Sequence, residues 1–92
     1  MNLIPTKEFT KTVSKITDKI ALKRLDELTI KLEEATFLNE IPNVIQLKGA
    51  QGLFRITTGN YRLIVKQVKN ELIIILLVDY RRRNEKTYRR LN

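Results

Sequence analysis

The 92-residue chain contains no cysteine and no histidine, and serine occurs only once, at Ser14. Without cysteine there can be no disulfide framework and no thiol chemistry. The absence of histidine removes the commonest general base and metal ligand. Ser14 falls within a predicted helix, which makes a serine nucleophile implausible. Any catalysis by this chain must therefore rest on arginine, lysine and tyrosine side chains.

Long apolar runs and cofactor motifs are also missing. The longest apolar run, residues 72–78, is far shorter than the ~20 residues of a membrane-spanning helix. The chain has no Walker loop, no dinucleotide glycine fingerprint and no zinc-ligand spacing. Asp79 and Glu85 are isolated, whereas most metal-dependent nucleases need clustered acids. We therefore expect a cytoplasmic protein with no membrane contact, no metal and no cofactor.

What the chain does contain is positive charge, concentrated toward its C-terminal end. Residues 62–92 hold nine Lys or Arg and three Asp or Glu, while residues 1–61 hold nine and seven. A basic balance of this kind predicts a polyanionic partner, with nucleic acid favoured over a merely solvated basic surface. The length predicts a single domain over residues 1–92 with one modest core.

The firmest structural prediction is a β-hairpin around Gly59-Asn60. Two β-rich runs, residues 53–58 and 61–68, are separated by only these two residues, which suits a type II′ turn. The turn fixes the register, with Ile56 opposite Leu63 and Thr57 opposite Arg62. Side chains alternate along each strand. One face is then apolar (Phe54, Ile56, Leu63, Val65), and the other carries Arg55, Thr57, Arg62, Ile64 and Lys66.

A second turn near Lys69-Asn70 leads into a strand over residues 71–80. A loop with an even number of residues would place Leu72, Ile74 and Leu76 on the apolar face. It would also place Ile73, Ile75, Leu77, Asp79 and Arg81 on the face of Arg62. A loop with an odd number would reverse this assignment. The sequence leaves this choice open.

The N-terminal half predicts a short edge strand over residues 1–4 followed by two helices. Phe9, Val13, Ile16 and Ile20 recur at helical spacing after Pro5-Thr6. A second helix, capped by Thr17 or Asp18, has an apolar stripe of Leu22, Leu25, Leu28, Leu32 and Ala35. Residues 37–52 are expected to form an irregular connection. The fold class is thus α+β, with a helical hairpin on a three- to four-stranded antiparallel sheet.

Several segments together resemble the RelE/ParE superfamily of toxins from bacterial type II toxin–antitoxin systems. The resemblance spans nearly the whole chain. It is carried by the Leu47-Lys48-Gly49 step before the sheet, by the turn motif at residues 59–63 (Gly-Asn-Tyr-Arg-Leu), and by the arginine run that precedes Tyr88. The resemblance implies a RelE-like fold, with a short C-terminal helix in some members. It further implies a cytoplasmic bacterial toxin.

The RelE branch, which we favour, resembles endoribonucleases that cut mRNA on the ribosome, whereas ParE-like toxins inhibit DNA gyrase. Matched position by position, the resemblance implies catalytic roles for Arg62, Arg81 and Tyr88. It implies RNA-binding roles for Lys48, Arg55, Lys66, Arg82 and Arg83. The arginines and Tyr88 also have simpler interpretations. The arginines would form a solvated basic face, and Tyr88 would be a core residue whose hydroxyl reaches solvent.

One position departs from the RelE pattern. Thr57 stands where RelE-like enzymes often carry a lysine that helps activate the attacking 2′-hydroxyl. Either another group such as Lys66 serves, or cleavage is weak, or the chain is a gyrase inhibitor or an inactive homologue that only binds. The partners implied by the resemblance are a cognate antitoxin and mRNA on the ribosome. Operator DNA would be bound by the toxin–antitoxin complex through the antitoxin.

Overall fold

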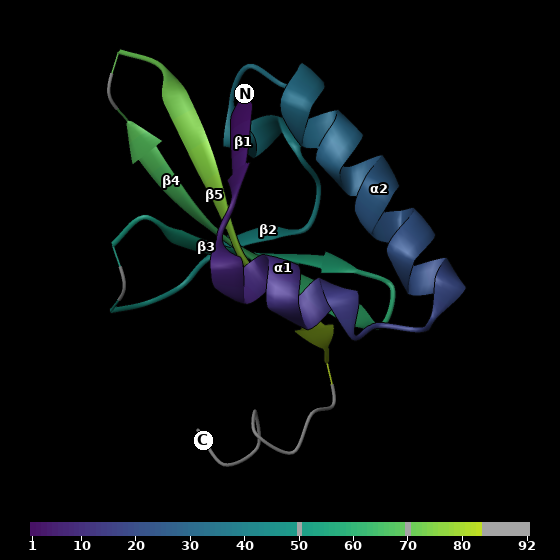
Figure 1. Ribbon diagram of the computed structural model, residues 1–92. Helices are drawn as coiled ribbons and strands as arrows, with labels where there is room; N and C mark the ends of the chain where they lie inside the picture. The colour runs from purple at the N-terminus through teal and green to yellow at the C-terminus, as the bar shows by residue number, and fades with distance from the viewer. Residues whose placement is uncertain (50, 70, 84–92) are drawn as a thin grey trace.

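The computed structural model, which describes residues 1–49, 51–69 and 71–83, shows two helices lying on one face of a five-stranded sheet (Figure 1). The α+β class and the helical hairpin are confirmed. The elements are β1 (Asn2–Pro5), α1 (Lys7–Ser14), α2 (Lys19–Glu34), the 3₁₀ turn η1 (Leu38–Glu40), β2 (Val44–Gln46), β3 (Leu53–Thr58), β4 (Tyr61–Lys69) and β5 (Ile73–Arg82).

The strand order is β1-β5-β4-β3-β2, so the sheet has five strands rather than three or four. β2 lies within the segment expected to be irregular, and β1 pairs in parallel with β5. The sheet is therefore mixed rather than wholly antiparallel. β1, which was expected over residues 1–4, and the additional strand β2 are both short and occupy the two edges, where pairing depends on segments distant in the sequence. The C-terminal helix implied by the resemblance falls outside the described residues.

Each helix begins at a side-chain cap. The Thr6 hydroxyl accepts from the Phe9 N–H at 3.2 Å, and the Asp18 carboxylate accepts from Ile20 and Ala21. Such caps satisfy backbone donors that have no partner inside the helix. The helical conformation is interrupted at residues 15–18, between α1 and α2. Ile20 therefore belongs to α2, where its side chain is exposed, and is not part of the apolar stripe of α1. The structure thus corrects the expectation for Ile20.

A single core fills the space between the helices and the sheet. Leu25, Leu28 and Leu32 of α2 are buried, together with Phe9 of α1. Burying an aliphatic side chain of this size stabilises a fold by roughly 1.5–3 kcal/mol. Across the core they face the inward side chains of the sheet: Ile56, Tyr61, Leu63, Val65, Ile75, Leu77 and Tyr80. Within the described residues, no helix is both long enough and apolar enough to cross a membrane.

The hairpin around Gly59-Asn60 has the predicted register. Ile56 pairs with Leu63, Thr57 with Arg62 and Thr58 with Tyr61. Gly59 has a φ of 60°, and Asn60 is not among the residues with positive φ, as a type II′ turn requires. The sheet face that carries Arg55 and Arg62 therefore lies opposite the helices, and we call it the open face.

The second hairpin differs from the even-loop expectation. Lys69 pairs with Ile73, which leaves three residues in the loop. Ile75 and Leu77 consequently point into the core, while Ile74 and Leu76 lie on the open face. A β-bulge then interrupts the pairing, because Val65 pairs with Leu77 and Ile64 with Asp79. The extra residue shifts the alternation, so Asp79 and Arg81 return to the open face, where they were expected.

Candidate functional site

The open face brings two arginines directly opposite one another. Arg62 of β4 pairs with Thr57 of β3 on one side and with Arg81 of β5 on the other. Side chains of directly opposite residues share a face, with Cβ atoms about 4.5–5.5 Å apart. Like charges placed this way destabilise a sheet. A bound anion, such as a phosphate held by paired guanidinium donors, would relieve that repulsion.

Asp79 lies beside this pair and orients one member of it. Its Oδ2 atom accepts from Nε of Arg81 at 2.5 Å, and its Oδ1 atom accepts from the Tyr80 N–H at 2.9 Å. The Arg81 side chain is 54% exposed, so the pair stabilises the fold by at most about 1 kcal/mol. Because the contact uses Nε, the two terminal nitrogens of Arg81 are not part of this ion pair. The resemblance gave no hint of this carboxylate's role.

Arg55 lies one row away from the arginine pair. It pairs with Ile64, which is two residues from Arg62 along β4, so the two arginines are diagonal neighbours. The Nε atom of Arg55 is buried and has no hydrogen-bond partner in the described part of the chain. A buried donor without a partner is costly. Arg55 therefore holds unused hydrogen-bonding capacity close to the arginine pair.

Two of the expected lysines lie further along the sheet. Lys66 shares the open face but is four residues from Arg62, about 13 Å along the strand. It cannot take the place of a lysine at Thr57 beside the arginine pair. Lys48 lies beyond Leu47, whose N–H donates to Leu53 at the far end of β3. The structure therefore does not bring Lys48 or Lys66 to Arg62 and Arg81.

The remaining expected site residues follow β5. Arg82 pairs with Tyr61, so its side chain belongs to the opposite sheet face from Arg81. Arg83 follows in a turn, and its N–H donates to the Asn60 carbonyl at 2.8 Å, which ties the end of β5 to the first hairpin turn. Tyr88 lies outside the described residues. Among the expected residues that the structure describes, Arg55, Arg62 and Arg81 gather on the open face, and Arg83 follows two residues after Arg81.

Two buried tyrosines lie on the helix side of β4 and β5, next to the arginine pair in the sequence. The rings of Tyr61 and Tyr80 stack with centroids 4.8 Å apart, and the Tyr80 hydroxyl donates to the Ala21 carbonyl at 2.8 Å. Burial, with a further contribution from Tyr61, raises the pKa of Tyr80 to about 12. Tyr80 is thus a neutral anchor that fixes the end of β5 next to Asp79 and Arg81.

The open face becomes mostly apolar away from the arginines. Beyond Arg55 and Ile64 one row contains Leu53, Lys66, Leu76 and Ile4, and the next contains Val68 and Ile74. The three arginines therefore gather at the end near Gly59-Asn60, and Lys66 stands apart from them among apolar residues. Within residues 1–49, 51–69 and 71–83, no three acidic side chains gather in a group that could hold a metal ion.

Comparison with known proteins gives the family and the fold. A family described as "ParE toxin of type II toxin-antitoxin system, parDE" matches residues 3–85. A chain of the RelB–RelE antitoxin–toxin complex from Methanococcus jannaschii superposes with a TM-score of 0.73 and 21% identity, covering 97% of this chain and 99% of that one. The RelE–RelB complex from Pyrococcus horikoshii gives 0.70 and 24%, covering 91% and 96%. No match was found among curated proteins.

Proposed function

The chain belongs to the ParE toxin family of type II toxin–antitoxin systems, and we propose that this toxin is a metal-independent endoribonuclease that cuts mRNA on the ribosome. The observation that supports the proposal is the direct pairing of Arg62 with Arg81 on the open face. Two guanidinium groups in this position can hold the oxygens of one phosphate. The RelE-like fold of the two solved structures is consistent with it.

The proposed reaction uses a nucleophile that RNA itself supplies. The 2′-hydroxyl attacks the adjacent phosphorus, the bond to the 5′-oxygen of the next nucleotide breaks, and a 2′,3′-cyclic phosphate forms. The enzyme must align the hydroxyl with the phosphate and stabilise the extra negative charge of the transition state. Arg62 and Arg81 would supply this charge stabilisation. Tyr88 would assist proton transfer or stack on a base.

Substrate positioning is assigned to the other basic residues. Arg55, one row from the arginine pair, would hold a neighbouring phosphate, and Lys66 would contact RNA further along the open face. Lys48 lies at the far end of β3, Arg82 belongs to the other face of the sheet and Arg83 follows β5 in a turn, so we assign them RNA or ribosome contacts at the periphery. The ribosome would hold the mRNA in place, which accounts for a site with so few groups.

We also propose that a cognate antitoxin, encoded beside this chain, binds the toxin and blocks it. The two similar solved structures are complexes of a RelE toxin with a RelB antitoxin. The positive charge of this chain favours an acidic or amphipathic antitoxin segment that folds on binding. The complex would bind operator DNA through the antitoxin.

A second candidate function is inhibition of DNA gyrase. Two observations favour it: the matching family is that of ParE toxins, and Thr57 rather than lysine lies beside Arg62. A threonine hydroxyl cannot act alone as a base at neutral pH. In this reading the arginines would contact gyrase or its DNA instead of an RNA phosphate.

One experiment separates the candidates, including an inactive homologue. The protein is induced in bacteria, mRNA ends are mapped by primer extension, and gyrase supercoiling is assayed in parallel. The nuclease proposal expects mRNA cuts that require translation and disappear in Arg62→Ala. Intact mRNA with inhibited supercoiling would instead support the gyrase reading. Healthy growth with neither effect would leave only a binding function.

A further inference from the structure

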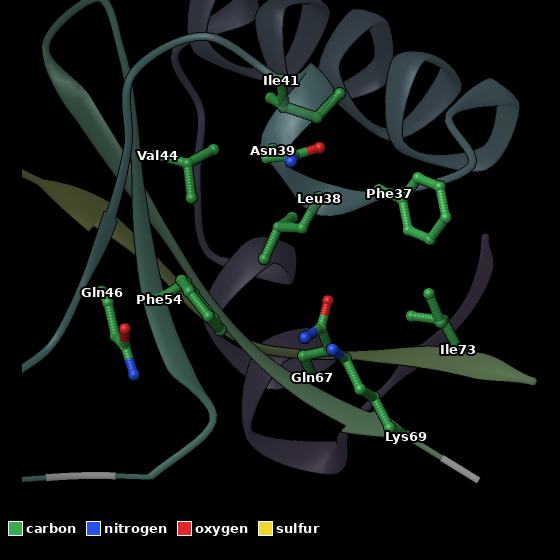
Figure 2. A pocket seen from close by; sticks show the side chains of 10 residues that line it. All are labelled: Phe37, Leu38, Asn39, Ile41, Val44, Gln46, Phe54, Gln67, Lys69 and Ile73. Atoms are coloured by element: carbon green, nitrogen blue, oxygen red, sulfur yellow. The ribbon is translucent and has the colours of Figure 1, made fainter.

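A second surface lies on the helix side of the sheet, away from the arginines. It is a groove of about 480 Å³ between η1 and the strands β2 to β5. Figure 2 shows Leu38 and Phe54 in its middle, with Val44 and Gln46 toward one end and Phe37 and Ile73 toward the other. Phe37 is 55% exposed although it is a large aromatic residue. The groove thus offers apolar surface that the helices do not cover.

The backbone of β2 borders one end of this groove with free hydrogen-bonding groups. The Leu47 N–H donates to the Leu53 carbonyl, and the Asn43 carbonyl accepts from the Thr57 N–H. The backbone N–H and C=O groups of odd-numbered residues in and beside β2 therefore point toward β3. In an antiparallel pair the intervening residues point their N–H and C=O groups the other way. Those residues are Val44 and Gln46. Since β2 is the edge of the sheet, their backbone groups meet no further strand within residues 1–49, 51–69 and 71–83.

The same two residues also line the groove with their side chains. A strand added to β2 would therefore satisfy the backbone groups of Val44 and Gln46 and place alternate side chains over the apolar groove. Edge strands accept an added segment in this way, with backbone bonds giving affinity and pockets giving specificity.

The charge of this region indicates what kind of segment would bind. Of the five basic residues in segment 41–70, Arg55, Arg62 and Lys66 lie on the open face, which leaves Lys48 and Lys69 on the side of the groove and of β2. Lys69 lines the groove itself, and Lys48 lies two residues beyond the end of β2. An added strand with acidic side chains would be complementary to these residues, whereas a basic strand would be repelled.

We propose that β2 and this groove bind an extended acidic segment of the antitoxin, which adds a strand to the sheet and places apolar side chains in the groove as far as Phe37. The proposal rests on the proposed antitoxin partner, but it concerns a surface separate from the open face. It follows that the antitoxin segment could bind here without covering Arg62 or Arg81.

The test measures binding of the wild-type chain to the protein encoded beside it, by titration calorimetry at low salt. Gln46→Pro removes the outward N–H while keeping the bonds to β3, and proline is tolerated on edge strands. We expect it to weaken binding at least about tenfold. Gln46→Ala keeps the N–H and is expected to bind as the wild type does.

A second pair of variants examines the groove. Phe37→Ser is expected to weaken binding at least about tenfold, because buried aromatic anchors dominate interfaces. Ile30→Ser is the matched control, since Ile30 is also half-exposed (52%) but lies on α2 outside the groove. Hydrogen exchange is expected to show protection of the Val44 and Gln46 amides on binding. Thermal unfolding checks that each variant remains folded.

The failures are distinguishable. Wild-type binding that neither Gln46→Pro nor Phe37→Ser weakens would overturn the groove proposal and leave the antitoxin partner standing. No binding of the wild type would overturn both the antitoxin partner and this groove assignment, while leaving the nuclease proposal to its own assay. A wild-type dimer that Gln46→Pro dissociates would overturn the proposal by assigning the edge to a second copy of this chain.

Discussion

The side chains around the β4–β5 pair carry the functional account at the scale of single residues. Arg62 and Arg81 are direct cross-strand neighbours, and only Asp79 places a negative charge next to Arg81 in the described ion pairs. Such a pair of like charges lowers stability, by up to about 1 kcal/mol. A surface selected only for solubility has no need of this arrangement. A phosphate site does, because two planar donors can share its oxygens.

Tyr80 makes the stability of the protein vary with pH in the alkaline range. Its pKa rises from the ordinary value of 10.0 to about 12 on folding, so the folded state keeps the phenol proton that the unfolded chain releases. Stability from this group is complete below about pH 10 and is lost as the pH rises toward 12. The loss amounts to about 2–3 kcal/mol over that range.

The variant Tyr80→Phe isolates this effect. It removes the hydrogen bond to the Ala21 carbonyl, so we expect it to be about 1 kcal/mol less stable at neutral pH. Between about pH 10 and 12 its free energy of unfolding should fall less steeply than that of the wild type. Urea unfolding at several pH values measures both curves, and lysine titration cancels in their difference. Parallel curves would contradict the assignment.

At the scale of elements, the two hairpins show what local sequence can and cannot predict. The first was predicted in full, because Gly59-Asn60 determines both turn type and register. The second depends on loop length and on the bulge between Ile64 and Val65, neither of which has a local signature. The loop is odd, so residues 73–77 have the faces that the odd alternative gave them. The bulge then returns Asp79 and Arg81 to the face that the even alternative gave them.

Gly59 is an element-scale test of the first hairpin. Its φ of 60° favours glycine, and a Cβ there would lie 1.8 Å from Nη1 of Arg24. The Arg24 side chain is long and can move aside, so we expect the backbone to dominate the effect. Gly59→Ala should lower the free energy of unfolding by about 1–2 kcal/mol. Gly59→Asn should cost no less, because the first central position of a type II′ turn lies outside the αL region that asparagine tolerates.

Combining Gly59→Ala with Arg24→Ala separates the two causes. If backbone strain dominates, the cost of Gly59→Ala measured by urea unfolding is the same in the Arg24→Ala background. A cost that disappears in that background would show that the contact with Arg24, and not the turn conformation, requires glycine.

At the scale of the whole molecule, the fold gathers part of the positive charge on one face of the sheet. The net charge of +8 indicated a polyanionic partner, but composition alone could not say which basic residues gather. Arg55, Arg62 and Arg81 gather because they share strand pairs and a face. Lys48 and Arg82 do not join this group. Lys48 lies beyond the edge strand β2, and the side chain of Arg82 belongs to the opposite face of the sheet. The β2 edge and its groove were not predicted, because they arise from pairing between distant segments.

Salt dependence measures how many of these charges contact RNA. If Arg55, Arg62 and Arg81 each neutralise a phosphate of single-stranded RNA, the logarithm of the binding constant should fall with log salt at a slope of about −2. Arg62→Ala should make that slope shallower by about 0.7. Lys23→Ala, an exposed residue on α2, is the control and should leave it unchanged. Fluorescence anisotropy with a short oligonucleotide provides the measurement, and equal slopes for wild type and Arg62→Ala would contradict the assignment.

The central claim is that Arg62 and Arg81 act together on one RNA phosphate during translation. The most direct measurement is cleavage of a defined mRNA by the purified protein, with and without translating ribosomes. We expect cleavage only with ribosomes, a loss of about 10²–10³-fold in rate for Arg62→Ala or Arg81→Ala, and a smaller loss for Arg62→Lys, which keeps the charge but not the paired donors. Lys23→Ala should cleave at the wild-type rate. Intact mRNA with the wild-type protein on translating ribosomes, or undiminished cleavage by Arg62→Ala, would contradict the account.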